Sequence, residues 1–360
     1  MREFGSEFEN ISLPDNYFSK QCSLFKNHKY TRSGREAISL IAISIRKKAV
    51  ETKSIVLLPS YICPSMIVAF DNKAWDIYYY NLNKDFTVNQ SDLTSKIRFY
   101  KPACVFIANY FGKTENENII DLIKTAQPKV NIVYDVTHSL LSLPELYNDK
   151  IDYYVASLRK WFGIADGGFV LTNNFLMMDI VKTNDNSKFI NMRELSLNFK
   201  KVYMSNNDVK LKKKFKENLR NAELFLNTEF IYRMSERTLI KLNSLNISEI
   251  KRKRNINYLH LLDQIKSNPS IRLAVNIEED KLKYYTFMLP LLFENRYEMQ
   301  KIYSDNGLYT QVIWKIPTNA QQCKNSVFIS NRILCVPIDQ RYNYWDIEDI
   351  AKIINDNTKL

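Results

Sequence analysis

The segment 153–168, YYVASLRKWFGIADGG, decides the fold class. It begins with a short apolar run typical of a buried β-strand and continues through Ser157 and Lys160 to a glycine pair. A second apolar run, residues 132–134, leads directly into Asp135, which precedes Tyr153 by eighteen residues. Two buried strands that end in polar side chains predict a sheet with its functional groups at the strand ends.

Similar short runs recur from Ser33 to about Thr172 and alternate with longer amphipathic stretches. Residues 34–50 and 117–126 carry apolar side chains at helical spacing. Strands that alternate with helices are typical of βαβ units and therefore of a parallel sheet. We expect an α/β fold: a mostly parallel central sheet with helices on both faces. The predicted strands are residues 55–58, 77–80, 104–107, 132–134, 153–156 and 169–171.

The sequence changes character after Asn173. Residues 182–266 are rich in lysine and asparagine, have helical periodicity and contain no convincing strand signal. The remainder begins with the run 284–293 and then predicts strand-like runs at 310–313 and 333–336 and helices at 296–306 and 346–354. We expect two domains: a large α/β domain with an N-terminal arm, residues 9–210, and a smaller C-terminal α+β domain, residues 211–360. Residues 1–8, MREFGSEF, resemble an added tag and are left aside.

The composition excludes several classes of protein. Of 360 residues, 45% are hydrophobic, enough for a substantial core, so disorder is not expected. No apolar run approaches the ~20 residues that span a bilayer, and the polar N-terminus has no secretory pattern. Five scattered cysteines without a C-x-x-C pair predict reduced thiols in a cytoplasmic protein. Three histidines provide little for a zinc site, and we expect no metal.

The formal net charge is +12, which raises the question of an anionic partner. The lysines are densest in two stretches, 210–216 and 251–254, both of which look helical. A solvated helix face is the simpler explanation, and no finger, RNP-like or basic-zipper pattern accompanies them. We therefore expect no nucleic acid and no membrane partner, although the charge suits a phosphorylated ligand.

Glycine is scarce, with seven in 360 residues against an average usage of about 7%. Five of the seven (Gly34, Gly112, Gly163, Gly167 and Gly168) fall at predicted strand ends or helix starts. The stretch around Ser33 and Gly34 opens the first long helix, where free backbone N–H groups hold phosphate. Ordinary turn glycines would produce the same pattern.

Asp135, Ser157 and Lys160 together suggest a chemistry. A lysine amine forms a Schiff base with the aldehyde of pyridoxal 5'-phosphate, and a carboxylate pairs with the pyridinium nitrogen of that cofactor. The same amine, once displaced by the substrate, carries a proton between carbon atoms. We predict Lys160 and Asp135 as catalytic residues, with Ser157 and the N–H groups after Ser33 binding the phosphate. Taken singly, Asp135 would pass for a helix cap and Lys160 for a solvated lysine.

In this order, the motifs resemble those of the DegT-type sugar aminotransferases, which are fold-type I pyridoxal phosphate enzymes. The resemblance covers about residues 30–175 and, more weakly, 336–342. It rests on Ser33-Gly34, Leu58-Pro59-Ser60-Tyr61, Tyr110-Phe111-Gly112, Asp135, His138, Lys160 and Gly167-Gly168. It implies Asp135 at the pyridinium nitrogen, His138 near the phenolic oxygen and Lys160 in the Schiff base. Arg35, Tyr61 and Asn109 are the further candidate cofactor contacts, besides Ser33, Gly34 and Ser157.

The resemblance also implies a function. It predicts an aminotransferase that moves an amino group from glutamate to a nucleotide-linked keto sugar, for surface polysaccharide or glycoconjugate synthesis, in a homodimer. A different fold-type I reaction, by a lyase or an amino-acid aminotransferase, stays open. So does a catalytically silent binding protein of the same fold. The dehydratase branch of the family replaces the lysine, so Lys160 argues against it.

Overall fold

A computed structural model describes residues 2–11, 28–48, 54–71, 75–112, 117–183, 187–227, 230–275 and 285–358. The chain forms two compact units, and neither is a continuous stretch of sequence. Unit 1 comprises Met1–Ser6, Ala49–Asp152 and Ile247–Leu360, and unit 2 comprises Glu7–Lys48 and Tyr153–Asn246. The predicted boundary at residue 210 assumes two consecutive domains, and it stays a prediction.

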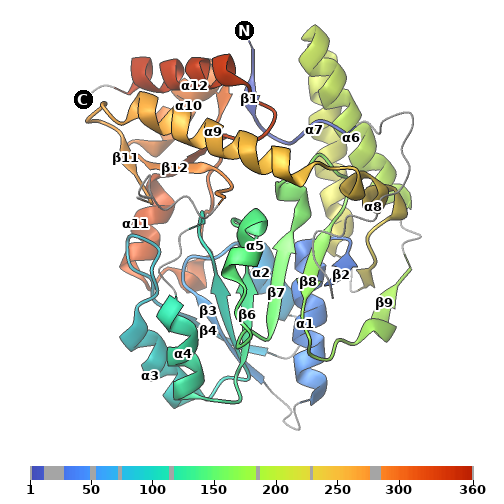
Figure 1. Cartoon of the computed structure of the whole chain (residues 1–360), viewed down its shortest axis with the longest axis vertical. Helices are drawn as coiled ribbons and strands as arrows, with labels where there is room; N and C mark the ends of the chain where they lie inside the picture. The colour runs from blue at the N-terminus through green and yellow to red at the C-terminus, as the bar shows by residue number, and fades with distance from the viewer. Residues whose placement is uncertain are drawn as a thin grey trace. The chain divides into compact units, whose positions relative to one another are not determined.

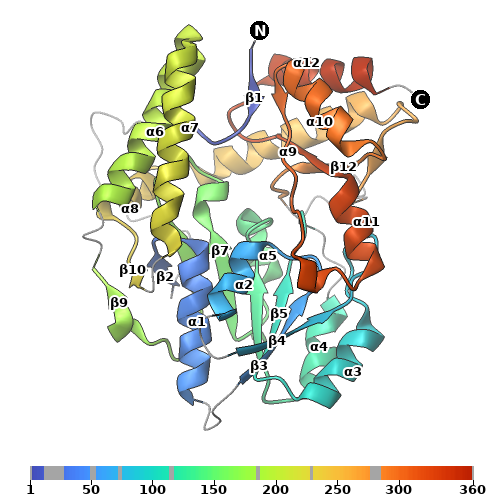
Figure 2. The same ribbon diagram turned by 180° about the vertical axis from the view of Figure 1, so that it is seen from behind.

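Unit 1 contains a layer of four parallel strands in the order β6-β5-β3-β4. They are β3 (Ser54–Pro59), β4 (Trp75–Tyr80), β5 (Cys104–Ala108) and β6 (Asn131–Asp135). The helices are α2 (Pro64–Asp71), α3 (Gln90–Tyr100) and α4 (Glu117–Ala126). In Figures 1 and 2, α3 and α4 lie on one side of these strands and α2 lies on the other. This covering explains why every residue of β5 is buried and apolar, and it confirms the predicted parallel sheet.

The C-terminal part of unit 1 is an antiparallel sheet with helices packed on it. The sheet consists of β11 (Arg272–Leu273), β12 (Leu289–Leu292) and β14 (Ile333–Val336). The helices are α9 (Ile247–Ile265), α10 (Arg296–Asp305), α11 (Lys324–Arg332) and α12 (Tyr344–Asn357), and the short α5 spans Leu143–Leu146. Side chains of α9, α10, α12, β12 and β14 share one buried apolar cluster.

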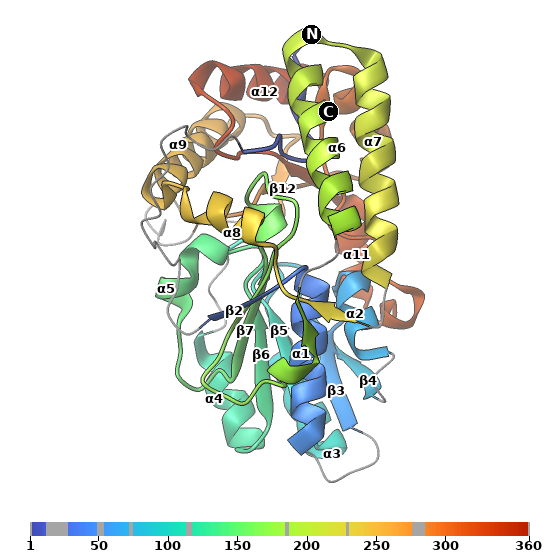
Figure 3. The same cartoon turned by 90° about the vertical axis from the view of Figure 1, so that its right-hand side faces the viewer.

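Unit 2 is built on three antiparallel strands in the order β2-β8-β7. These are β2 (His28–Thr31), β7 (Tyr153–Ser157) and β8 (Gly168–Leu171), and α1 (Gly34–Lys48) packs on β7 and β8. The helices α6 (Ser187–Asn206) and α7 (Val209–Glu223) form a long hairpin (Figure 3). The remaining elements are α8 (Glu236–Asn243), the paired strands β9 (Val181–Lys182) and β10 (Ile231–Tyr232), and 3-10 turns at Leu158–Lys160, Met178–Ile180 and Leu224–Asn227.

Two expectations differ from the structure. The predicted strand at 310–313 is wrong: β13 is Leu308–Tyr309, and beyond it only Gln311 makes a single bridge, to Cys335. Residues 1–8, set aside as a tag, belong to the fold where they are described. Phe4 and Gly5 form β1, which pairs with β13, and the hydroxyl of Tyr342 accepts a hydrogen bond of 2.7 Å from the Gly5 N–H.

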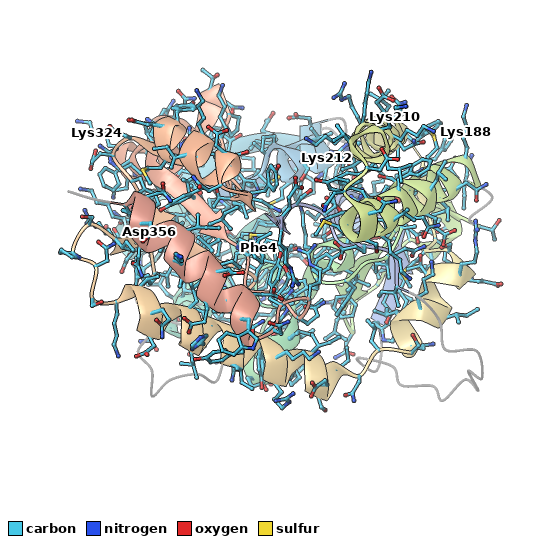
Figure 4. All side chains as sticks on the ribbon, turned by 90° about the horizontal axis from the view of Figure 1, so that it is seen from above. Phe4, Lys188, Lys210, Lys212, Lys324 and Asp356 are labelled. Carbon is cyan, nitrogen blue, oxygen red and sulfur yellow. The ribbon has the colours of Figure 1, made fainter. Side chains whose placement is uncertain are left out.

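The lysine-rich run lies on α7 (Figure 4). Lys210, Lys213, Lys214 and Lys216 are exposed there, as expected of a solvated helix face. The stem of Lys212 is half-buried and places its ammonium over the Tyr203 ring of α6. Within the described part of the chain, no helix combines the length and the apolar character needed to cross a membrane.

Candidate functional site

The predicted phosphate-binding residues come together at one end of the strands of unit 2. Thr31 on β2 and Ser157 on β7 both lie opposite Gly168 on β8. The start of α1 therefore reaches the end of β7, where a Cβ on Gly34 would lie 3.0 Å from that of Ser157. A Cβ on Gly168 would overlap the carbonyl oxygen of Ser33, so only glycine permits this approach.

Ser33 caps α1 at this point. Its hydroxyl oxygen accepts a hydrogen bond of 3.2 Å from the backbone N–H of Glu36, and its carbonyl accepts one of 3.0 Å from Ala37. The first N–H groups of any helix have no partner within the helix, and they carry the positive end of the helix dipole. The junction thus combines a fifteen-residue helix with the hydroxyl groups of Ser33 and Ser157, which are suitable donors for a phosphate.

Lys160 ends the 3-10 turn that directly follows β7. Within this turn Leu158 and Trp161 are fully buried, and the backbone N–H of Leu158 donates to the carbonyl of Gly167 at 3.1 Å. The side chain of Lys160 itself is exposed. The turn thus fixes the backbone of the lysine while leaving its amine accessible to a ligand.

A buried ion pair between Arg32, just before α1, and Glu36 in its first turn was not predicted. Arg32 is fully buried and donates from Nε to Glu36 Oε1 at 2.7 Å, and its guanidinium lies over the ring of Tyr232. Burial raises the pKa of Glu36 to about 7, although Arg32 acts in the opposite direction. The i,i+4 spacing was visible in the sequence, but the burial of the pair depends on unit 2 packing around it.

Arg35 points elsewhere than expected. Its Nη1 donates to the carbonyl oxygen of Leu226 at 3.3 Å, in the 3-10 turn after α7. Its role as a cofactor contact stays a prediction.

The other predicted residues belong to unit 1, at the carboxyl ends of its parallel strands. Asp135 ends β6 and is only 3% exposed. Burial raises the pKa of its carboxyl to about 6. Hydrogen bonds from Thr137 act to lower that pKa, and in one of them the Thr137 backbone N–H donates to Oδ1 at 2.7 Å. A positively charged neighbour would stabilise the ionised form of such a buried carboxyl, so this position favours the binding of a cation.

Asn109 follows the neighbouring strand, β5, and lies beside Asp135. Its backbone N–H donates to the carbonyl of Asp135 at 2.9 Å, and its side-chain amide donates to the hydroxyl of Tyr134 at 2.9 Å. The structure therefore brings these two predicted residues together through adjacent parallel strands.

His138 and Tyr61 lie within a cluster of rings that the sequence analysis did not foresee. The imidazole of His138 stacks on the rings of Trp314 and Phe287 at centroid distances of 5.0 and 5.4 Å. Tyr61 is fully buried, lies 5.6 Å from Trp314 and donates its hydroxyl to the carbonyl of Ile313. The two predicted residues thus share Trp314, which is half-buried, as a neighbour.

Two further charged residues of unit 2 were missed. Glu7, in the segment set aside as a tag, pairs with Arg193 of α6 at 3.2 Å. Arg193 is 1% exposed and also donates from Nε to the carbonyl of Ala165, five residues after Lys160. No sequence signal marked either of them, because a charged residue in a polar segment or a helix is ordinarily solvated.

Comparisons with known proteins give structural neighbours only, since neither a family model nor a curated protein sequence matches the chain. Helicobacter pylori PseC, an aminotransferase involved in pseudoaminic acid biosynthesis, aligns with a TM-score of 0.67 over 99% of each chain at 14% identity. DesV of S. venezuelae, solved with a ketimine intermediate, aligns at 0.63 over 92% of this chain and 85% of its own, at 12% identity. A DegT DnrJ EryC1 StrS aminotransferase from Brucella abortus gives 0.63 over 92% and 86%, also at 12% identity. The chain therefore has the fold of these aminotransferases.

Proposed function

We propose that the chain is a pyridoxal phosphate-dependent aminotransferase. The observation that carries this proposal is the closure of the capped N-terminus of α1 against Ser157, three residues before Lys160. A phosphorylated aldehyde cofactor requires a site for its phosphate and, close to it in the chain, an accessible amine. The junction would supply the first, and Lys160 on the following turn would supply the second.

Each unit, taken by itself, offers groups that suit this cofactor in chemical terms. Ser33, Gly34 and Ser157 offer hydroxyl and backbone N–H groups for the phosphate, and Lys160 offers the amine for the aldehyde. Asp135 offers a buried carboxylate whose pKa is raised by burial, and a cationic neighbour would favour its charged form. A protonated ring nitrogen would be such a neighbour.

Bound pyridoxal phosphate supplies an aldehyde for the amine and a ring that accepts electrons from the substrate carbon. Lys160 would hold the cofactor and, when released, move the proton at that carbon. Asp135 would keep the ring nitrogen protonated. His138, Tyr61, Asn109 and Arg35 are proposed as further cofactor contacts, Arg35 with the least support because its guanidinium binds Leu226.

For the substrate we propose a nucleotide-linked keto sugar with glutamate as amino donor, serving surface polysaccharide or glycoconjugate synthesis. Support comes from the sugar aminotransferases among the structural neighbours and from the net charge of +12, which suits a diphosphate. A homodimer and a cytoplasmic location belong to the same proposal. The four cysteines in the described part of the chain are free thiols, in keeping with a reducing compartment.

The first experiment records the visible spectrum of the purified protein with added pyridoxal phosphate. We expect a band near ~420 nm that glutamate bleaches, and borohydride should fix the cofactor to the peptide that contains Lys160. A Lys160→Ala variant should lack the band. Persistence of a reducible band in this variant would show that another lysine holds the cofactor.

A band that ignores glutamate would keep the cofactor and favour a lyase or another amino donor. No band in the parent protein would favour the silent binding protein. Once the cofactor is established, a panel of nucleotide-linked amino sugars can be tested as amino donors in the reverse reaction. The amino sugar that bleaches the same band would identify the acceptor.

A further inference from the structure

The indole of Trp314 stacks on the imidazole of His138 in unit 1. The two ring centroids are 5.0 Å apart and the ring planes meet at 26°. His138 is 5% exposed and also contacts Phe287, at 5.4 Å and 16°, and Phe111, at 4.8 Å and 36°. An imidazole forms hydrogen bonds in its own plane, through its two ring nitrogens. The rings that stack on His138 therefore fix the directions in which these nitrogens point.

The backbone on both sides of the indole is anchored by side chains from other elements. The carbonyl of Ile313 accepts a hydrogen bond from the hydroxyl of Tyr61, which follows β3. The carbonyl of Trp314 accepts one of 2.8 Å from the hydroxyl of Ser330 on α11. The Ser330 oxygen in turn accepts a hydrogen bond of 3.3 Å from the backbone N–H of Ile316. Trp314 is thus held by its own segment and does not depend on His138 for its place.

The second stacked ring, Phe287, is anchored by a buried arginine. Arg254 of α9 is 2% exposed, and its Nη1 donates to the carbonyls of Phe287 at 3.1 Å and Thr286 at 3.4 Å. Its Nε donates to Oε1 of Gln340 at 2.8 Å. Both rings that stack on His138 therefore belong to segments with a fixed backbone.

The backbone of His138 is itself fixed to the end of β6. The backbone N–H of Thr137 donates to Oδ1 of Asp135 at 2.7 Å, and that of Ser139 donates to the carbonyl of Val136 at 2.9 Å. With the backbone held, rotation about the side-chain bonds of His138 decides where its ring nitrogens lie. Stacking on Trp314 restricts this rotation.

We propose that Trp314 is a positioning residue for His138, whose imidazole it holds in one plane by stacking. This inference rests on the proposed function, in which His138 contacts the phenolic oxygen of pyridoxal phosphate. A hydrogen bond to that oxygen stabilises its negative charge and so influences the wavelength at which the bound cofactor absorbs. Trp314 acts on the cofactor only through His138.

The first test compares the wavelength of the visible band among variants loaded with pyridoxal phosphate. Trp314→Leu keeps an apolar side chain but has no ring, so its band maximum should move in the same direction as that of His138→Asn. Trp314→Phe restores a ring and should return the maximum towards that of the parent. The matched control is Trp345→Leu, because Trp345 is 73% exposed on α12 and packs against Tyr344 instead. Its maximum should equal that of the parent, and an equally unmoved maximum in Trp314→Leu would overturn the proposal.

A double-mutant cycle tests whether Trp314 acts through His138. Single-turnover bleaching of the band by glutamate should slow by about tenfold in Trp314→Leu, because the imidazole is no longer held in its productive orientation. In the His138→Asn background the same substitution should leave the rate unchanged, since the group that Trp314 positions is absent. Equal slowing in both backgrounds would overturn the proposal and assign Trp314 a direct role.

The last test uses the cofactor-free protein with isotope-labelled histidine. The chain has three histidines, and the ring current of the indole should shift the NMR signals of the His138 imidazole upfield. Trp314→Leu should move these signals downfield, whereas those of His260, which stacks on Tyr344 at 4.3 Å, should stay in place. If Trp314→Leu does not fold, the smaller ring of Trp314→Phe carries the test. His138 signals that are identical in this variant and in the parent would then overturn the proposal.

The spectra also separate this proposal from the proposed function. A parent protein that shows the shifted His138 signals but binds no cofactor would retain the contact between the two rings and reject the function, together with the role that rests on it. A normal visible band whose maximum is the same in Trp314→Leu and the parent would retain the function and reject the role of Trp314.

Discussion

At the scale of single residues, Asp135 shows that the site is built at a cost to the fold. Its carboxyl is buried, and burial raises its pKa from 3.8 to about 6. The unfolded chain therefore loses this proton at a lower pH than the folded chain. As the pH rises from about 4 through about 6, the folded state without cofactor loses stability, and above that range the loss is constant.

Replacing Asp135 should therefore stabilise the cofactor-free protein while impairing it as an enzyme. At about 1.4 kcal/mol per pKa unit, Asp135→Asn should raise the free energy of unfolding at pH 8 by up to roughly 3 kcal/mol. At about pH 3 the gain should almost vanish, since the parent carboxyl is then neutral in the folded chain and largely neutral in the unfolded chain. Urea denaturation followed by circular dichroism at both pH values measures this, and an equal change at both would exclude the titration of Asp135 as its source.

The same variant makes a prediction for catalysis. The cofactor should still bind to this variant, because its phosphate and aldehyde contacts are unchanged. Turnover with glutamate should fall by about a hundredfold or more, because an asparagine cannot keep the ring nitrogen protonated. Single-turnover bleaching of the visible band measures the step directly. Near-normal bleaching would show that Asp135 does not pair with the ring.

Asp135 and Lys160 could be proposed from the sequence because each follows an apolar run that is typical of a buried strand, and the structure has both strands. Glu7 and Arg193 could not, since their importance arises from burial among residues far apart in the chain. Local sequence reports the end of a strand, whereas a charge network depends on which helix packs on which turn.

At the scale of elements, the β2–α1 junction is the feature on which the proposed phosphate site depends. Gly168→Ala would force the Cβ into the Ser33 carbonyl and should push the start of α1 away from β8, weakening pyridoxal phosphate binding at least tenfold, a cost of about 1.4 kcal/mol. Gly34→Ala is the matched control, because its Cβ at 3.0 Å from that of Ser157 requires only a small shift and should cost less affinity. Fluorescence titration with the cofactor compares the two. Equal affinity in Gly168→Ala and the parent would disprove the role of this junction.

The start of α12 provides a contrasting test. Asn343 and Asp346 form a reciprocal capping box, with hydrogen bonds of 3.1 and 3.0 Å. Asn343→Ala should lower the free energy of unfolding by about 1 kcal/mol. None of the residues proposed to bind the cofactor lies on this helix, so the visible spectrum should not change. A changed spectrum with unchanged stability would contradict both expectations.

The elements themselves follow from local pattern where a strand is apolar on both faces, as in β5 and β6. The predicted strand at 310–313 failed for a tertiary reason. The hydroxyl groups of Tyr61 and Ser330 bind the carbonyls of Ile313 and Trp314, and these side chains take the place of a neighbouring strand. A β-branched run cannot reveal a partner that comes from another part of the chain.

At the scale of the whole molecule, cofactor binding should stabilise the chain by mass action. At a hundredfold excess over its dissociation constant, pyridoxal phosphate should add about 2.7 kcal/mol to the free energy of unfolding. Lys160→Ala should lose most of this gain, because it cannot bond the aldehyde. Pyridoxine phosphate, which has no aldehyde, is the control and should stabilise both proteins to the same small extent. Equal gains with pyridoxal phosphate in parent and variant, measured by thermal unfolding, would argue against a covalent link at Lys160.

The α/β class of the fold was predictable at this scale, because strands that alternate with helices along the chain are compatible with few ways of packing a sheet and its helices. The division into compact units was not. Contacts group residues 7–48 with 153–246 in one compact unit, and composition cannot reveal that two segments so far apart in the chain pack together.

The interleaved units also set an order in which the protein can be completed on the ribosome. The last segment of unit 2 ends at Asn246, whereas unit 1 needs Ile247–Leu360. At about 5–20 residues per second, unit 2, which holds Lys160 and the α1 junction, is fully synthesised roughly ten seconds before unit 1. During that interval the parallel strands of unit 1 have already been made, but their C-terminal segment has not. Chaperones that shield exposed apolar strands should therefore stay bound to the nascent chain until residues 247–360 have been made.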